Sequence, residues 1–530
     1  MRRIVEVLMH ISRPPISSLV RRVMESVALG LALLMPAISA PASDRCNAIL
    51  PDAAVDVGSE GLPSQQTRWS IIQQLWEQIG EKLQNNIEQS SAAGLSGDTV
   101  DLIQGRTNDA LREAISQRRD ALASSLLKLW LVPLARLSQR DRFLAYYLTP
   151  AQRVGEASLE HAQYMWVDND GLEAVLHSAI YLAGATDIAL AVAQRATPDR
   201  SEQFTSFARR ISELALSHYT RWAFGPPHIW QVRGFGCDAS GLDLVEFTQR
   251  RADRSLGNGR FSYCVAPTDL DMLLVIGISN LLRISKIAPE LMALSSYDSD
   301  RLSSLLRLQT EYMASRLVWR PTIDPDGQSV STVDFDPGAW ASHEEWSYAS
   351  DESPRFPVTR PNANISVGRD ISHGYRIAWM AMTLAEHSEV AQLAADWNAV
   401  ADALARQFGY FVVDLSTNVP KFRNYLDGSN GWYRVNYNGK MGFGYPPYGL
   451  SRTFLEMPWA RLANRDSRLM TATLKMWEVL SIPSHAACTD FDRIYVEGNF
   501  WKDWRPFIRP FSDWMGQLSM LPFIAVSPVR

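Results

Sequence analysis

The chain repeats one pair of predicted helices several times. An apolar segment near Asp170 (GLEAVLHSAIYLAG) precedes an amphipathic one (SEQFTSFARRISELALSHY), and the same order returns near Thr268, near Asp370 and, in shorter form, after Gly449. A helix that is apolar on all sides must be buried, whereas a helix with one apolar face covers others from outside. The alternation therefore predicts an all-α fold of the (α/α) toroid type, an inner ring of helices inside an outer ring. A helical solenoid or an irregular bundle is the alternative architecture.

Repeated helical hairpins make the inner helices parallel, so we expect their N-terminal ends to gather at one end of the ring. Asp170, Thr268, Asp370 and Gly449 would then lie around a shared cleft. Further helices are expected between residues 65 and 148. Short β-hairpins in the loops are expected in the segments VRGFGC, GRFSYCVAP, WYRVNYNGKMGFG and RIYVEG.

Residues 1–42 are predicted to be a signal peptide. Arg21 and Arg22 precede an apolar run, and Ala40-Pro41-Ala42 has the small residues of a cleavage site. Residues 43–530 would then be one exported domain, periplasmic or extracellular. No later segment approaches the roughly 20 uninterrupted apolar residues of a membrane helix, so no membrane span is expected after the signal is removed.

Charge and cysteine content narrow the possible partners. The formal net charge is −5, and no basic cluster suggests nucleic-acid binding. The four cysteines suit two disulfides, which we expect to join Cys237 to Cys264 and Cys46 to Cys488, although the other pairings remain open. Their spacings fit no zinc pattern, so neither a metal nor another cofactor is expected. Nothing in the sequence predicts the oligomeric state.

The segment RDISHGYRIAWMAMTLAE, which begins at Arg369, carries the most chemistry. Asp370 is a suitable N-cap for a buried helix, and His373 and Arg376 follow it. Helix N-termini leave unpaired amide donors and a partial positive charge, so anionic ligands are commonly placed there. The alternative is a capped core helix whose polar groups only satisfy neighbouring backbone.

Tryptophans in loop-like segments suggest a saccharide cleft. Indole rings pack against the apolar faces of sugar rings, while nearby polar groups bind the hydroxyls. The tryptophans in such segments are Trp166, Trp222, Trp230, Trp340, Trp346, Trp432, Trp501 and Trp504.

Together with predicted secretion and repeated helical hairpins, these features resemble the α/α-toroid carbohydrate-active proteins. That group includes the alginate and chondroitin lyases and the six-hairpin glycosidases. The resemblance covers residues 65 to 527 in architecture, and its motif is the segment from Asp370 to Arg376. An Asn-Asn-His-Tyr pattern of some alginate lyases is absent. The resemblance implies an enzyme that degrades polysaccharide, either a lyase or a hydrolase.

A lyase that acts on a uronate needs a group that neutralises the carboxylate, a base and an acid. We expect Arg376, with Arg369 nearby, to hold the carboxylate, and His373 to be the base. Tyr375, Tyr437 or Tyr445 would be the acid. Because residues 373 and 376 share a helix face that residue 375 does not, a loop tyrosine is preferred. Asn362 or Asn364 would bind the substrate carboxyl group.

An inverting glycoside hydrolase would instead need two carboxyl groups. Asp170 and the loop WASHEEWSYASDE, which contains His343 and Glu344, supply candidates, and Asp370 would be the base. A third possibility is an exported protein that binds polysaccharide without cleaving it.

Overall fold

The computed structural model describes most of the chain after residue 60. The described residues are 61–90, 97–146, 153–168, 170–225, 242–255, 261–324, 327–361, 365–387, 393, 395–439, 441–481, 485–496, 500–501 and 514–529. The chain forms two compact units, Met1–Ala42 and Ser43–Arg530. The predicted signal peptide lies outside the described residues.

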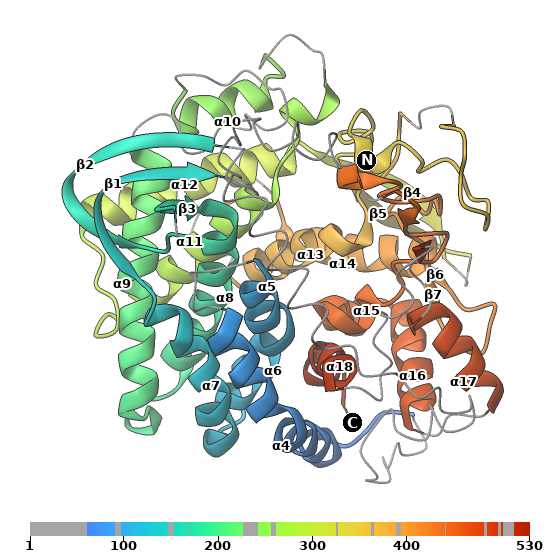
Figure 1. Cartoon of the computed structure of the whole chain (residues 1–530), viewed down its shortest axis with the longest axis horizontal. Helices are drawn as coiled ribbons and strands as arrows, with labels where there is room; N and C mark the ends of the chain where they lie inside the picture. The colour runs from blue at the N-terminus through green and yellow to red at the C-terminus, as the bar shows by residue number, and fades with distance from the viewer. Residues whose placement is uncertain are drawn as a thin grey trace, which may run out of the picture. The chain divides into compact units, whose positions relative to one another are not determined.

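Six helical segments of the second unit contact one another in a closed series. Each segment contacts the next, and the last contacts the first (Figure 1). In this order they are α6 (Arg106–Ser116), α8 (Val175–Gln194), α11 (Asp269–Ile287), α13 (Ile371–Glu386), η10 (Pro458–Arg465) and α18 (Trp514–Val526).

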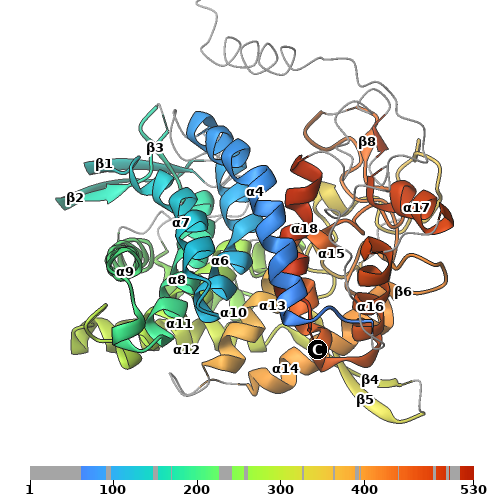
Figure 2. The same cartoon turned by 90° about the horizontal axis from the view of Figure 1, so that it is seen from below.

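A second set of helices packs on this series from outside. The pairs are α7 (Asp120–Leu134) on α6, α9 (Glu202–Phe224) on α8, α12 (Ser296–Ala314) on α11, α14 (Trp397–Gln407) on α13 and α16 (Ser467–Ser481) on η10. Helix α4 (Gln65–Ser90) contacts both α18 and α7, as Figure 2 also shows. The described chain is mainly helical, as predicted, but the expected order is reversed in one pair, because α6 of the inner series is amphipathic and α7 is the more apolar helix.

Burial explains the composition of the inner helices. Every residue of α8 from Val175 to Ala193 except His177 is buried. Two described helical segments, Val175–Gln194 and Ser262–Ile287, are long and apolar enough to cross a membrane, and 94% of the 18-residue apolar window of each is buried inside the protein. Such burial is the usual property of a core helix.

Hydrogen bonds between inner helices connect α11 to α8 and show that α11 and α13 run in the same direction. Asn280 of α11 donates to Thr186 of α8 over 3.3 Å, about midway along both helices. At the start of α11, Asp269 accepts from Arg376 near the start of α13, and Ser279 further along contacts His387 at the end of α13. The N-termini of α11 and α13 therefore lie at the same end.

Short helical segments and small sheets complete the fold. The segments are α5 (Gly97–Val100), η3 (Asp101–Gly105), η4 (Thr197–Asp199), α10 (Leu244–Ala252), η6 (Ser262–Val265), η7 (Glu344–Trp346), η8 (Phe408–Val412), η9 (Tyr437–Gly439), α15 (Thr453–Glu456), α17 (His485–Phe491) and η11 (Asp492–Val496). The sheets are β2-β1-β3 (Arg153–Met165, Ser138–Tyr146, Leu172–Ala174), β4-β5 (Leu317–Ile323, Ser329–Phe335), β6-β7 (Val413–Asp414, Lys421–Phe422) and β8-β9 (Phe443–Gly444, Phe500–Trp501).

Several secondary-structure expectations were wrong. The segment 138–146, expected to be helical, pairs with β2, because a partner strand later in the chain supplies hydrogen bonds that local patterning does not reveal. GRFSYCVAP contains the 3₁₀ turn η6, and the described part of RIYVEG, residues 493–496, lies in η11, which follows α17. WYRVNYNGKMGFG does bend back on itself, through the Tyr433–Tyr445 bridge. VRGFGC lies outside the described residues.

Cysteine pairing remains a prediction. Cys264 is disulfide-bonded, but no disulfide joins two residues whose side chains are both described.

A buried ion pair anchors the start of α11. Arg251 of α10 and Asp271 form two hydrogen bonds of 2.7 Å, and both side chains are fully buried. Asp271 also completes the capping box with Thr268. Burial acts to raise the pKa of Asp271, but the charge and hydrogen bonds of Arg251 lower it below its usual value.

We expect Arg251→Ala to lower the free energy of unfolding by about 3–5 kcal/mol, because it leaves a buried carboxylate uncompensated. The adjacent pair of Arg250 with Glu246 is nearly half exposed, so Arg250→Ala should cost no more than about 0.5 kcal/mol. Urea denaturation of both variants measures the difference. Equal losses would contradict this account of the pair.

Candidate functional site

The carboxylate of Asp370 organises the start of α13. Its Oδ1 accepts a hydrogen bond from the backbone N–H of His373 over 3.1 Å and another from the hydroxyl of Ser372. Asp370 is fully buried and caps the helix as predicted. Burial acts to raise the pKa of Asp370, but the charge of His373 and the hydrogen bonds from His373 and Ser372 outweigh it and hold the pKa well below its usual range. Asp370 is therefore an anion.

The same carboxylate orients the imidazole of His373. Nδ1 lies 2.9 Å from Oδ1 and 3.1 Å from Oδ2 of Asp370. An acceptor at Nδ1 places the proton of the neutral ring there and leaves Nε2 as the basic nitrogen. The described residues give Nε2 no hydrogen-bond partner, and the side chain is 22% exposed. His373 is thus an oriented base with access to solvent.

Two guanidinium groups beside His373 share one carboxylate. Asp269 accepts from Arg369 and, over 2.9 Å, from Arg376. Burial acts to raise the pKa of Asp269, but the charges of Arg376 and Arg369 lower it. This group of three side chains carries one net positive charge. We expected Arg376 to hold a substrate carboxylate, but its Nη1 already binds Asp269.

A loop from another part of the chain completes the site. The hydroxyl of Tyr433 lies 3.3 Å from Nδ1 of His373 and donates to Glu345 over 2.5 Å. Arg434 binds both oxygens of Glu345, through Nε at 2.9 Å and Nη2 at 3.3 Å. Sequence reasoning did not select Tyr433, Arg434 or Asp269. Of these three, only Asp269 could have been found from the sequence, because it directly follows Thr268, the N-cap of an inner helix.

Both predicted loop tyrosines lie in this group of residues. The ring of Tyr445 is centred 5.9 Å from that of Tyr433, and the two residues also pair through their backbones. Tyr445 is partly exposed, and burial raises its pKa. Tyr437 lies under the guanidinium of Arg434, 5.3 Å from it. Burial and the nearby charge of Glu345 raise the pKa of Tyr437 to about 12.

The described tryptophans of the predicted loop set that are buried are Trp166, Trp222, Trp346 and Trp432, and Trp222 lies within α9 rather than in a loop. Trp166 and Trp432 are at most 1% exposed and donate to backbone carbonyl oxygens of Pro133 and Ser353. Trp346 is also buried, and it stacks on Trp340. Ring faces that already contact one another are not available to a sugar. A direct substrate-binding role for Trp166, Trp346 and Trp432 is therefore corrected to one in loop packing.

The other predicted residues are distributed differently. His343 is buried among aromatic rings, and its Nδ1 accepts from the backbone N–H of Glu345, while Glu344 is exposed. Burial lowers the pKa of His343. Tyr375 is 3% exposed, which agrees with its position off the polar face of α13 and argues against substrate binding.

Of the last four predicted residues, the structure describes the side chain of Asp170 alone. Asp170 lies in an exposed turn before β3. Asn362, Asn364 and the side chain of Trp501 lie outside the description.

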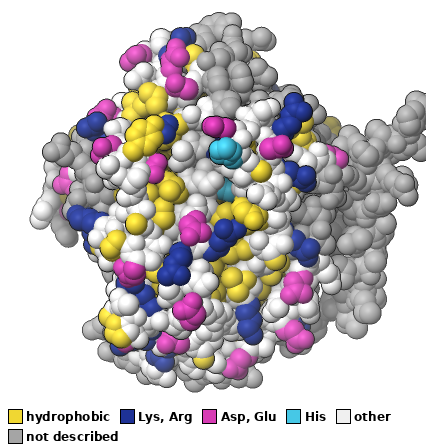
Figure 3. Space-filling model, turned by 90° about the vertical axis from the view of Figure 1, so that its left-hand side faces the viewer, with side chains coloured by type: hydrophobic (Ala, Val, Ile, Leu, Met, Phe, Trp, Pro, Cys, Tyr) yellow, Lys and Arg dark blue, Asp and Glu magenta, His cyan; other side chains and the backbone are white. Residues whose placement is uncertain are grey.

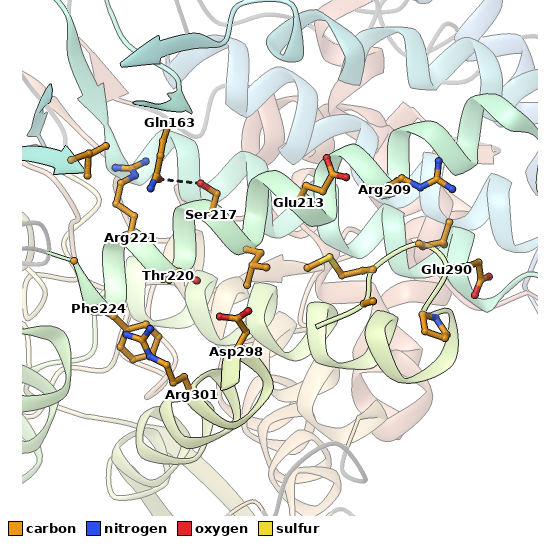
Figure 4. Close-up of a pocket in the computed structure, with 17 residues that line it drawn as sticks. Gln163, Arg209, Glu213, Ser217, Thr220, Arg221, Phe224, Glu290, Asp298 and Arg301 are labelled. Carbon is orange, nitrogen blue, oxygen red and sulfur yellow. Dashed lines mark hydrogen bonds between the residues drawn. The ribbon is translucent and has the colours of Figure 1, made fainter. Parts of the chain in front are cut away.

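A groove on the outer layer is separate from this site. It has a volume of about 770 Å³ and is lined by α9, β2, the α11–α12 connection and α12 (Figure 4). Gln163 and Ser217 hydrogen-bond within it over 3.1 Å. The face of the molecule in Figure 3 mixes acidic, basic and apolar side chains without one dominant charge. The residues that line this groove include no histidine, so it has no counterpart of the Asp370–His373 pair.

No group of three or more potential metal ligands occurs among the described side chains. Comparisons with protein-family models, with curated proteins and with solved structures found no match to this chain.

We expect Asp370→Ala to lower the free energy of unfolding by about 1–3 kcal/mol at neutral pH, because it removes a cap and leaves buried donors unpaired. The pKa of Asp370 is depressed in the folded state. The ionised carboxylate therefore contributes to the free energy of unfolding at pH values above its unfolded-state pKa of about 3.9. This contribution is lost as the pH falls toward the folded-state pKa. The difference between the parent and Asp370→Ala should accordingly shrink below about pH 4.

Chemical denaturation at a series of pH values measures this difference. Asp396→Ala removes the exposed cap of α14 and serves as the control, with an expected cost of about 1 kcal/mol. A difference for Asp370→Ala that stays constant through acid pH would contradict the assignment of Asp370 as a buried anion.

Proposed function

We propose that residues 43–530 form an (α/α) toroid that is exported and degrades a uronate-containing polysaccharide by β-elimination. The observation that carries the proposal is the imidazole of His373, oriented by buried Asp370 and partly exposed at the start of an inner helix. The closed series of inner-helix contacts supports the toroid. The N-terminus of α11, which runs parallel to α13, lies at the same end as His373 and supports a shared cleft there.

The residues near His373 suit the steps of β-elimination. The extra positive charge of Arg369 and Arg376 over Asp269 favours a substrate carboxylate. Nε2 of His373 removes the C5 proton, and the electrons of that C–H bond form the C4–C5 double bond. The C4–O bond breaks, and the departing oxygen takes a proton from Tyr445, which with Tyr437 is partly exposed. Asn362 or Asn364 would bind the substrate carboxyl group.

A glycoside hydrolase is the second candidate function, and the carboxyl group that favours it as a general acid is that of Asp336. Burial raises the pKa of Asp336 to about 6, against the charges of Arg316, Arg254 and Arg369, and a raised pKa suits a general acid. Asp336 also has a positive φ of 49°, an uncommon conformation that occurs at functional sites. Glu345 is a poorer acid, because Arg434 and His373 lower its pKa despite burial.

Mass spectrometry of products from alginate, chondroitin, polygalacturonate and neutral polysaccharides tests the proposal. We expect unsaturated oligomers from at least one polyuronate. His373→Ala should lower the rate by about 100-fold or more, the usual contribution of a general base. His161→Ala is the control, because His161 is 86% exposed on β2 and should leave the rate unchanged.

Other products would decide between the alternatives. Hydrated oligomers that disappear in Asp336→Asn would favour the hydrolase. Binding without any product would favour a non-catalytic polysaccharide-binding protein.

A further inference from the structure

We infer that Glu345 is a positioning residue that acts on His373 through the hydroxyl of Tyr433. Two carboxylates would then position the imidazole. Asp370 contacts it directly, and Glu345 acts through the hydroxyl of Tyr433. A role of Glu345 in catalysis rests on the proposed function, in which His373 is the base.

Tyr433 is the link between the loop and the helix. Its hydroxyl donates to Oε2 of Glu345 over 2.5 Å and lies 3.3 Å from Nδ1 of His373. Because the hydroxyl proton points to Glu345, the oxygen presents its lone pairs to the Nδ1–H group as a second, longer acceptor beside Asp370. Tyr433 is 0% exposed, so it cannot touch a substrate in this conformation. Its hydroxyl can act on the reaction only through a neighbour, and His373 is the neighbour that this hydroxyl contacts besides Glu345.

The loop that carries Glu345 is fixed on both sides. Arg434 binds the carboxylate through two nitrogens and donates its backbone N–H to the carbonyl oxygen of Glu345 over 3.0 Å. The backbone N–H of Glu345 donates to Nδ1 of His343 over 3.3 Å. Burial acts to raise the pKa of Glu345, but Arg434 and His373 lower it. Glu345 therefore remains an anion.

Charged groups face His373 from each element packed around it. The carboxylates favour the imidazolium that forms when His373 takes a proton, and the guanidinium groups oppose it. The carboxylates are Asp370 at the start of α13, Asp269 on α11 and Glu345 in one loop. The guanidinium groups are Arg369, Arg376 and Arg434. The other titratable groups are His343 and Tyr433. Glu345→Gln removes one negative charge and leaves Arg434 uncompensated. Both changes destabilise the imidazolium.

The experiment measures the rate at which diethyl pyrocarbonate modifies His373 as a function of pH, by peptide mass spectrometry on the full chain. The reagent attacks the neutral imidazole, so no substrate is needed. In Glu345→Gln the midpoint of the profile should move to lower pH by about 0.5 pH unit or more. Glu160→Gln, at a side chain that is 91% exposed on β2, should reproduce the parent profile.

Tyr433→Phe provides a second test that changes one oxygen atom. It removes the acceptor that Tyr433 offers to Nδ1–H, so its profile should also move to lower pH. In the Tyr433→Phe background, Glu345→Gln should shift the profile less than it does in the parent, since the two residues act as a unit. Circular dichroism verifies that each variant is folded, and Tyr433→Phe alone decides the matter if Glu345→Gln does not fold.

Profiles of Glu345→Gln and Tyr433→Phe that superimpose on the parent would overturn the inference and leave Glu345 as a structural anchor of its loop. Failure of the proposed function is distinguishable from this result. A shifted profile in a protein that releases no unsaturated product would refute the lyase and retain the action of Glu345 on His373.

Discussion

The buried carboxylate of Asp370 is the interaction on which the candidate site depends. One side chain caps α13, accepts the hydroxyl of Ser372 and fixes the ring of His373. A buried anion is costly unless its neighbours compensate it, so the surrounding donors are required for stability as well as for orientation. The same contacts that stabilise the helix start thus leave Nε2 as the basic nitrogen, and stability and chemistry are coupled at this position.

The arrangement of the inner helices brings distant residues to this helix start. Asp269 reaches Arg369 and Arg376 only because α11 and α13 run in the same direction. Polar side chains also connect other neighbours, since Asn108 of α6 donates to Asp187 of α8 over 3.3 Å. In a core made largely of apolar helices, such specific bonds fix the register of one helix against the next.

Local features were predictable, whereas long-range contacts were not. The cap at Asp370 and the shared face of His373 and Arg376 follow from spacing within one helix. Tyr433 and Glu345 are separated by 88 residues, and no local pattern relates them. The tryptophan prediction failed for a different reason: composition counts aromatic rings but does not reveal which faces they present to one another. Strand β1 was missed because its partner determines its conformation.

The most direct test of the site is a crystal structure of the His373→Ala variant with an uncleaved uronate oligosaccharide. Our account predicts a sugar ring at the start of α13, with its carboxylate next to Arg376 and its C5 atom about 3–3.5 Å from the position that Nε2 occupies in the parent. An oligosaccharide bound only in the outer groove between α9 and α12, with none at α13, would contradict the assignment of His373 as the base.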